Sequence, residues 1–178
     1  MNALLALARA IDLVNERIGR AACWLTLIVV VVACANAILR YGFRLGSNAF
    51  LEIQWYMFAL IFLYGAAYTL LKGGHVRVDV LYSRFTPRRK AWIDILGGLL
   101  FFLPTTIGLT ILSLPMVTAS MQVWEQSGDV GGLPRWPIKL AIPIAFALLS
   151  LQGVSEIIKR VAFLRGLAPE PVYRKELQ

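Results

Sequence analysis

Charged residues are scarce in this chain of 178 residues: they make up 16% of it, against about 25% in soluble domains. Hydrophobic residues make up 58%, and the mean hydropathy is +0.68. This composition excludes a disordered chain or a coiled coil and argues against an ordinary soluble enzyme. With only two cysteines and one histidine, the sequence also argues against a disulfide framework and a histidine-rich metal site.

Long runs without Asp, Glu, Lys or Arg account for the high hydropathy. Residues 21–39 and 53–71 are two such runs of 19 residues, and a helix of that length spans about 28 Å, close to the ~30 Å hydrocarbon core of a bilayer. Two more runs lie at residues 95–124 and 140–155. We therefore predict an all-α integral membrane protein with four transmembrane helices, at about residues 21–39, 53–71, 92–124 and 137–157.

The basic residues predict the orientation of these helices. The net charge is +8, but the basic residues lie between apolar runs, which favours a membrane surface over nucleic acid as their partner. The N-terminal segment, the connection after the second run and the C-terminal segment together hold 14 Lys and Arg, whereas the other two connections hold 4. The positive-inside rule then places both termini in the cytoplasm.

Residues 1–20 show a helical pattern of their own. Apolar side chains recur every three or four residues, while charged side chains lie on another side, which is typical of an amphipathic helix at the cytoplasmic interface or a cytoplasmic extension of the first span. The apolar stripe consists of Leu4, Leu7, Ile11, Val14 and Ile18. A solvated leader is one alternative. A cleaved leader is another, because Ala33 and Cys34 loosely match a lipoprotein cleavage site.

The third helix has a clear start signal before its apolar run. Thr86 is a typical N-cap, and Pro87 suits the first helical position. The basic residues 88–90 that follow are most simply contacts to anionic lipid. Because a 30-residue apolar run exceeds the bilayer thickness, Pro104 and Pro115 are candidate kinks.

The apolar runs contain none of the chemistry that a carrier or an enzyme needs. Apart from cysteine and tyrosine, they hold no ionisable side chain, whereas ion pathways through membranes are lined by such groups. The sequence has no glycine-rich phosphate loop, no zinc-ligand cluster and no nucleophile–base pair. We therefore expect neither an enzyme nor a cofactor, but a membrane subunit that supports another protein.

Several short motifs together resemble a known family. They are Arg40-Tyr41, Glu52, residues 65–68 (GAAY), residues 74–79 (GHVRVD), residues 132–134 (GLP), Pro143 and residues 149–152 (LSLQ). This combination is similar to the small membrane subunit of TRAP (tripartite ATP-independent periplasmic) transporters, over roughly residues 20–160. Residues 65–79 are its most specific part.

The resemblance implies a function in organic-acid uptake. In this family a periplasmic binding protein captures an organic anion, and a large membrane subunit transports it with sodium. The small subunit packs against the large one and braces it in the membrane. Many members have two adjacent acids before the second span and a basic residue shortly after them. Here Leu51 stands in place of the first acid, and Trp55 stands where the basic residue is often found. A stand-alone membrane assembly or regulatory protein is the alternative.

Two groups of residues are candidates for contacts with these partners. Glu52 is either a carboxylate that favours the start of its helix or a partner of Arg40, Arg44 or another subunit. Small residues let membrane helices approach closely, within this chain or against the large subunit. The interface or structural group is Arg40, Glu52, Gly65, Ala66, Tyr68, His75, Arg77 and Asp79; the group for docking the binding protein is Arg44, Asn48, Arg135 and Trp136.

The segment around His75 has a second possible role. Residues 75–80 alternate polar and apolar side chains, which is typical of an extended segment with one buried face. We predict that residues 74–79 form a cytoplasmic structural latch, with a solvated loop as the alternative. The domain organisation that follows is a segment at 1–20, a membrane domain at 21–160 and a cytoplasmic tail at 161–178.

Overall fold

The computed structural model describes residues 2–74 and 85–169, and it is helical almost throughout. Its four long rods are α1 (Asn2–Gly42), α2 (Asn48–Leu71), a composite rod of α4 (Pro87–Gly97), η1 (Gly98–Phe102) and α5 (Leu103–Gln122), and α6 (Trp136–Leu164). Each rod is long enough and apolar enough to cross a membrane. The prediction of an all-helical protein with four such helices is confirmed.

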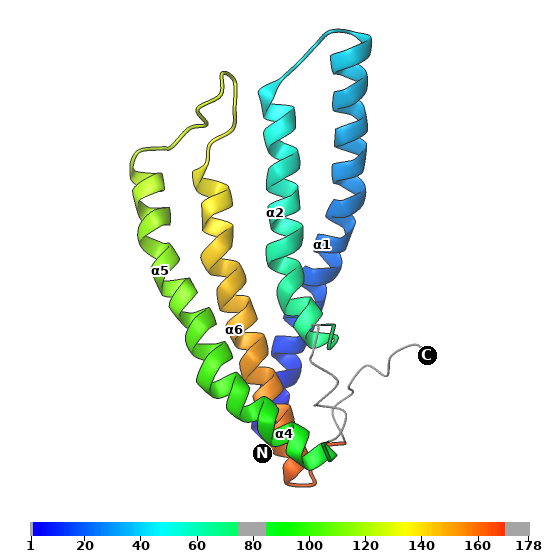
Figure 1. The fold of residues 1–178 in the computed structure, drawn as a ribbon, viewed down its shortest axis with the longest axis vertical. Coiled ribbons are helices and arrows are strands. Elements are labelled where there is room, and N and C mark those ends of the chain that lie inside the picture. Colours follow the sequence, from blue (N-terminus) through cyan, green and yellow to red (C-terminus); the bar gives the residue numbers. More distant parts are fainter. Residues whose placement is uncertain (1, 75–84, 170–178) are drawn as a thin grey trace.

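The four rods run in alternating directions (Figure 1). The α1–α2 and α5–α6 connections lie at one end of the bundle, and the start of α1, the start of α4 and the end of α6 lie at the other. Helix α6 is the central element, because it packs against α1, α2, α4, η1 and α5. We call the end with the two connections the loop end, and the opposite one the N-terminal end.

Helix α1 differs from the expected division at residue 20. One helix of 41 residues, about 62 Å long at 1.5 Å per residue, runs through that point without a break. No separate amphipathic segment exists, because Gly19 does not end the helix; it lies buried against α2. The continuous helix agrees with the other reading of these residues, an extension of the first span.

The buried face of α1 follows a seven-residue repeat. Its members are Ala8, Asn15, Ala22, Val29 and Asn36, a spacing that keeps one seam of a helix against its neighbour over many turns. The apolar stripe seen in the sequence is not on this seam. Leu4, Leu7 and Val14 are exposed, so the N-terminal part of α1 turns small and polar residues inward.

The third rod changes from an α-helix to a π-helix for one turn directly before Pro104. Pro104 has no N–H, and in a regular helix its ring would clash with the carbonyl four residues earlier. The five residues of η1 form a π-helical turn directly before it, with the Leu103 N–H donating to the Gly98 carbonyl. Helix α4 begins at Pro87 after the N-cap Thr86, which confirms the predicted start. Helix α5 continues through Pro115.

Two ends differ from the predicted spans. Helix α5 ends at Gln122, two residues before the expected end of the third span, and Trp124 leaves the helix with φ +46°. Helix α6 continues to Leu164, beyond the expected end at residue 157. It continues because the charged residues in its last turns bond to α1 and α4.

Small residues set the distances between the rods. A Cβ placed on Gly19 would lie 2.3 Å from the Cβ of Tyr68, and one placed on Gly153 would lie 2.6 Å from the Phe102 ring. Most buried hydrophobic residues of the described chain are alanines. Close backbone approach through small residues is the usual means of packing helices in lipid, where helix association gains little from the hydrophobic effect.

The contact between Gly19 and Tyr68 yields a test of the α1–α2 crossing. Gly19→Ala should lower the free energy of unfolding by about 1–3 kcal/mol, because the added methyl group forces two packed helices apart. Gly65→Ala is the matched control on α2, since a Cβ there meets nothing within 4 Å; it should change stability by less than about 1 kcal/mol. Denaturant unfolding of the purified chain in detergent measures both, and equal effects would contradict this packing.

Candidate functional site

Polar side chains gather in two places, one at each end of the bundle. At the loop end, Glu52 of α2 contacts the segment that joins α5 to α6. At the N-terminal end, Asp12 and Asn15 of α1 contact α6. We call these the Glu52 cluster and the Asp12 network.

The Glu52 carboxylate ties α2 to the α5–α6 segment. It is buried, and its Oε2 accepts a hydrogen bond from the Leu133 backbone N–H at 2.6 Å. Its Oε1 accepts one from the Ser127 hydroxyl. Nearby, the Tyr56 hydroxyl donates to the Pro134 carbonyl at 3.2 Å. The described residues give Glu52 no ion pair with Arg40 or Arg44, so its contacts within the chain are with this segment.

The α5–α6 segment has the shape that this carboxylate requires. A bridge between Gln126 and Pro134 and a hydrogen bond of 3.1 Å from the Ser127 N–H to the Leu133 carbonyl close it into a small hairpin. A Cβ placed on Gly132 would lie 2.4 Å from the Ser127 Cβ and 2.7 Å from Glu52 Oε1. Only glycine therefore fits at this position without moving the carboxylate.

A second carboxylate fixes the base of the same segment. Glu125 pairs with Lys139 of α6 and accepts a hydrogen bond of 2.7 Å from the Ser120 hydroxyl. The hydrogen bond from Lys139, and after it that from Ser120, lowers the pKa of Glu125 below its ordinary value. Because the folded-state pKa is depressed, the pair contributes stability above the ordinary pKa of glutamate and loses it as the pH falls through the depressed one.

The predicted docking residues lie at the loop end. The Asn48 side chain donates to the Val130 carbonyl at 3.0 Å and so links the two connections. Trp136 stands edge-on to Trp124, with ring centroids 6.0 Å apart. Arg44 and Arg135 are exposed, and Arg44 has a left-handed backbone with φ +56°.

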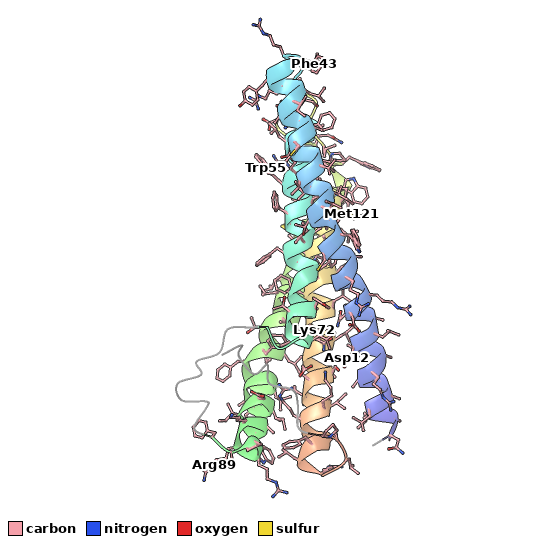
Figure 2. All side chains as sticks on the ribbon, turned by 90° about the vertical axis from the view of Figure 1, so that its right-hand side faces the viewer. Asp12, Phe43, Trp55, Lys72, Arg89 and Met121 are labelled. Carbon is pink, nitrogen blue, oxygen red and sulfur yellow. The ribbon has the colours of Figure 1, made fainter. Side chains whose placement is uncertain are left out.

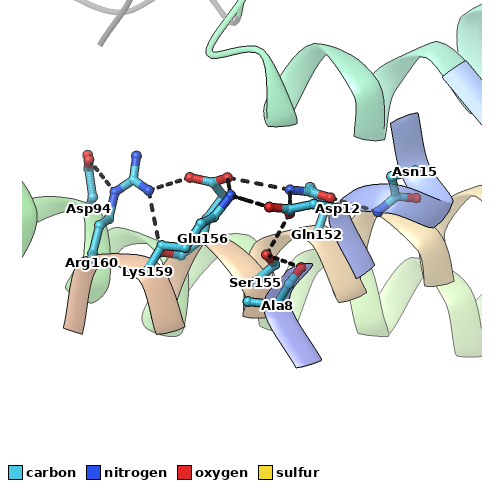
Figure 3. A network of polar contacts seen from close by, with 9 residues as sticks. All are labelled: Ala8, Asp12, Asn15, Asp94, Gln152, Ser155, Glu156, Lys159 and Arg160. Carbon is cyan, nitrogen blue, oxygen red and sulfur yellow. Dashed lines mark hydrogen bonds and ion pairs between the residues drawn. The ribbon is translucent and has the colours of Figure 1, made fainter. Parts of the chain in front are cut away.

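The Asp12 network joins α1 to α6 near the N-terminal end (Figure 3). The buried Gln152 side chain donates from Nε2 to Asp12 at 2.9 Å and accepts at Oε1 from Asn15 at 2.8 Å. The Ser155 hydroxyl donates to Asp12 at 2.7 Å, and Lys159 pairs with Asp12 at 3.1 Å. Buried polar groups that lack partners cost several kcal/mol, so these bonds fix which face of α1 meets α6.

The network continues along α6 to α4. Glu156 pairs with both Lys159 and Arg160, and the buried Arg160 guanidinium donates to Asp94 of α4 at 2.7 Å. Each carboxylate in this row therefore has a basic partner. The arrangement holds three helices together, and among the described residues no group of three His, Cys, Asp or Glu side chains could hold a metal ion.

The remaining predicted site residues are placed as follows. Arg40 is exposed in the last turn of α1, and Tyr68 packs over Gly19. Gly65 faces open space, with Ala66 half-buried beside it. His75, Arg77 and Asp79 lie outside the described residues, so the predicted latch remains a prediction.

The sequence reasoning missed the Asp12 network. The periodicity of residues 1–20 places Asp12 only on another side from the apolar stripe, and Gln152 enters only as part of a family motif. A usable signal was present, because Gln152, Ser155, Glu156 and Lys159 recur at three- and four-residue spacing at the end of an apolar run. Polar residues at that spacing lie on one face of a helix and require polar partners.

The glycine in the hairpin allows a direct test of the Glu52 cluster. Gly132→Ala should displace the Glu52 carboxylate and raise amide hydrogen exchange at Leu133 about tenfold, since a buried hydrogen bond is worth roughly 1–2 kcal/mol. Gly128→Ala, in the same segment, meets nothing within 4 Å and serves as the control. Unchanged exchange at Leu133 in the Gly132 variant would show that Glu52 does not hold the segment.

Comparison with known proteins identifies the family. Residues 29–163 match the family model described as "Tripartite ATP-independent periplasmic transporters, DctQ component". A protein of Haemophilus influenzae that is described as a TRAP transporter small permease is 23% identical over 137 residues, which cover 77% of this chain and 83% of that protein. No solved structure matches the chain. The chain belongs to the DctQ family of non-enzymatic permease components and is a multi-pass small permease subunit of a TRAP transporter.

Proposed function

We propose that this subunit is a rigid brace for the large transport subunit and that its loop end helps dock the periplasmic binding protein, during sodium-coupled uptake of an organic acid. The observation that carries this proposal is the burial and hydrogen bonding of the Glu52 carboxylate. It is buried, and it bonds to the Leu133 N–H and Ser127. A carboxylate committed to these groups supports a shape and is not free to bind a moving ion or substrate.

The other charged side chains support the same role. The carboxylates of the Asp12 network are paired with Lys159 and Arg160, and they lie toward one end of the bundle. Transport pathways depend on ionisable groups near the middle of the membrane. In this chain the apolar runs at residues 21–39 and 53–71 hold no charged side chain. Binding and movement of the organic acid are therefore assigned to the large subunit.

The orientation of the bundle in the inner membrane completes the proposal. We place the N-terminal end in the cytoplasm and the loop end in the periplasm. The 14-to-4 distribution of Lys and Arg supports this choice, and so does the chain topology, because the basic segments adjoin the start of α1, the start of α4 and the end of α6 (Figure 1). The basic residues 88–90 in the first turn of α4 then lie at the cytoplasmic leaflet, where anionic lipid attracts them.

The periplasmic face offers a defined surface for the binding protein. The Asn48–Val130 hydrogen bond and the Glu52 cluster hold the two connections together, so Arg44 and Arg135 project from a fixed frame. The aromatic pair of Trp124 and Trp136 borders it. Exposed cations on such a frame would steer an acidic partner surface and would lose that effect as salt rises.

The contacts to the large subunit are proposed on the outer face of α2 and at its two ends. Gly65 has open space in front of its Cα and could receive a helix at short distance. Arg40, Ala66 and the segment with His75, Arg77 and Asp79 are the further candidates.

Charge reversal at the loop end tests the docking role. Arg44→Glu combined with Arg135→Glu should raise the binding-protein concentration needed for half-maximal uptake about tenfold, at low salt, because two steering cations become repulsive. The variant complex should still assemble, since both side chains are exposed. Uptake by proteoliposomes with titrated binding protein measures the effect. Arg165→Glu, which is exposed at the other end of the bundle, is the control.

The same proteoliposomes test the brace. The small subunit alone should give no uptake under a sodium gradient, whereas the complete system should transport. Uptake by the isolated small subunit would overturn the brace, and an unchanged half-maximal concentration would assign docking to the large subunit alone.

A further inference from the structure

We propose that the apolar stripe on the N-terminal part of α1 is a docking site for an amphipathic helix of the large membrane subunit, which packs on it from the edge of the hydrocarbon core outward. The stripe consists of Leu4, Leu7, Ile11, Val14 and Ile18. The inference rests on the proposed function, because it names a surface through which the brace would act.

The stripe has the spacing of a helix-pairing seam. Its members are separated by 3, 4, 3 and 4 residues, which is the pattern of positions a and d in a coiled coil and is narrower than a general lipid-facing surface. Leu4, Leu7 and Val14 are exposed by 47–50%, whereas Ile11 and Ile18 are half-buried. Beside the seam lie the exposed small residues Ala3 and Ala10, which allow a second helix to approach closely.

The Asp12 network prevents this seam from turning inward. Ala8 and Asn15, which directly follow Leu7 and Val14, are buried against α6. Asp12 accepts hydrogen bonds from Gln152 and Ser155. Rotating α1 to bury the stripe would leave several of these polar groups without partners, at a cost greater than the gain from a few leucines. The stripe therefore stays on the outside of the bundle.

The depth of its N-terminal half places Leu4 and Leu7 beyond the reach of lipid chains. Glu52 and Lys72 delimit an uncharged stretch of α2 that matches the ~30 Å hydrocarbon core, and Lys72 pairs with Glu16 of α1 at 2.9 Å. Glu16 thus marks the edge of the core, and in Figure 2 Asp12 lies beyond Lys72 along the bundle. Leu4 and Leu7 precede Glu16 by 12 and 9 residues, or about 18 and 14 Å of helix, whereas the headgroup layer adds only ~5–8 Å on each side.

Charge selects the partner. Asp12 and Glu16, the acids of this segment, are already paired. The exposed Arg9 and Arg17 have no ion pair among the described residues, so the segment presents net positive charge. A second copy would therefore be repelled. Arg17 follows Val14 by three residues and borders the seam, where flanking charges select coiled-coil partners. The fitting occupant is a helix with an apolar seam and acidic neighbours, supplied by the large subunit of the same transporter.

Photo-crosslinking in the assembled complex tests the site. Leu7 and Leu13 are exposed to 50% and 49%, but only Leu7 belongs to the seam. A benzoylphenylalanine at position 7 should crosslink to the large subunit at least about fivefold more than one at position 13. As a second measurement, Leu7→Glu with Val14→Glu should reduce the large subunit retained on purification about tenfold, and Leu13→Glu should not.

The outcomes separate this proposal from the proposed function. Equal crosslinking from the two positions, crosslinking to a second copy of this chain, or an assembled complex with crosslinks to lipid alone would each overturn the docking site. Sodium-driven uptake by the same complex would in those cases leave the brace standing. Failure of uptake together with failure of the two unmodified subunits to co-purify would overturn the proposed function itself.

Discussion

The polar contact between α1 and α6 is the constraint on which the rest of this structure depends. Within the hydrocarbon core, helices have little hydrophobic drive to choose one rotation over another, because every outward face is equally stable in an apolar solvent. The choice therefore falls to polar contacts, which lie at the edges of the core. Buried amides and carboxylates do impose a choice, since they must find partners. The half-buried Asp12 carboxylate and the Asn15 side-chain N–H find theirs on Gln152 and Ser155, and this fixes the inward face of α1 at its N-terminal end.

The other contacts can be understood from that fixed pair of helices. Helix α6 carries the network onward through Arg160 to Asp94 on α4, and at the opposite end the Glu52 cluster ties α2 to the segment that precedes α6. Between these two polar ends the rods meet through alanine and glycine. The result is a frame that polar contacts hold at both ends, which fits the proposed brace.

The sequence predicts the four helices well, but it does not predict which face of each helix points into the bundle. Four uncharged runs are enough to indicate four long apolar helices, because a bilayer fixes the length of a span, and Thr86–Pro87 marks a helix start by local chemistry alone. The N-terminal stripe, by contrast, was read as the face that would bury itself at the membrane interface. The rotation of α1 is decided by Gln152, which is 140 residues away from Asp12, and no local pattern reports a partner at that distance. The role of Gly132 is likewise set by Glu52.

Solvent labelling of single cysteines in the isolated chain tests the fixed rotation of α1 most directly. Ala8 is buried and Ala10 is exposed. In a background without Cys23 and Cys34, a water-soluble maleimide should therefore modify Ala10→Cys at least about tenfold faster than Ala8→Cys. This ratio corresponds to a free energy of local opening of ~1.4 kcal/mol at position 8. Adding Gln152→Leu and Ser155→Ala removes partners of Asp12 and should bring the two rates together. If the difference between the rates persists in that variant, apolar packing rather than the Asp12 network orients α1, and the central claim is wrong.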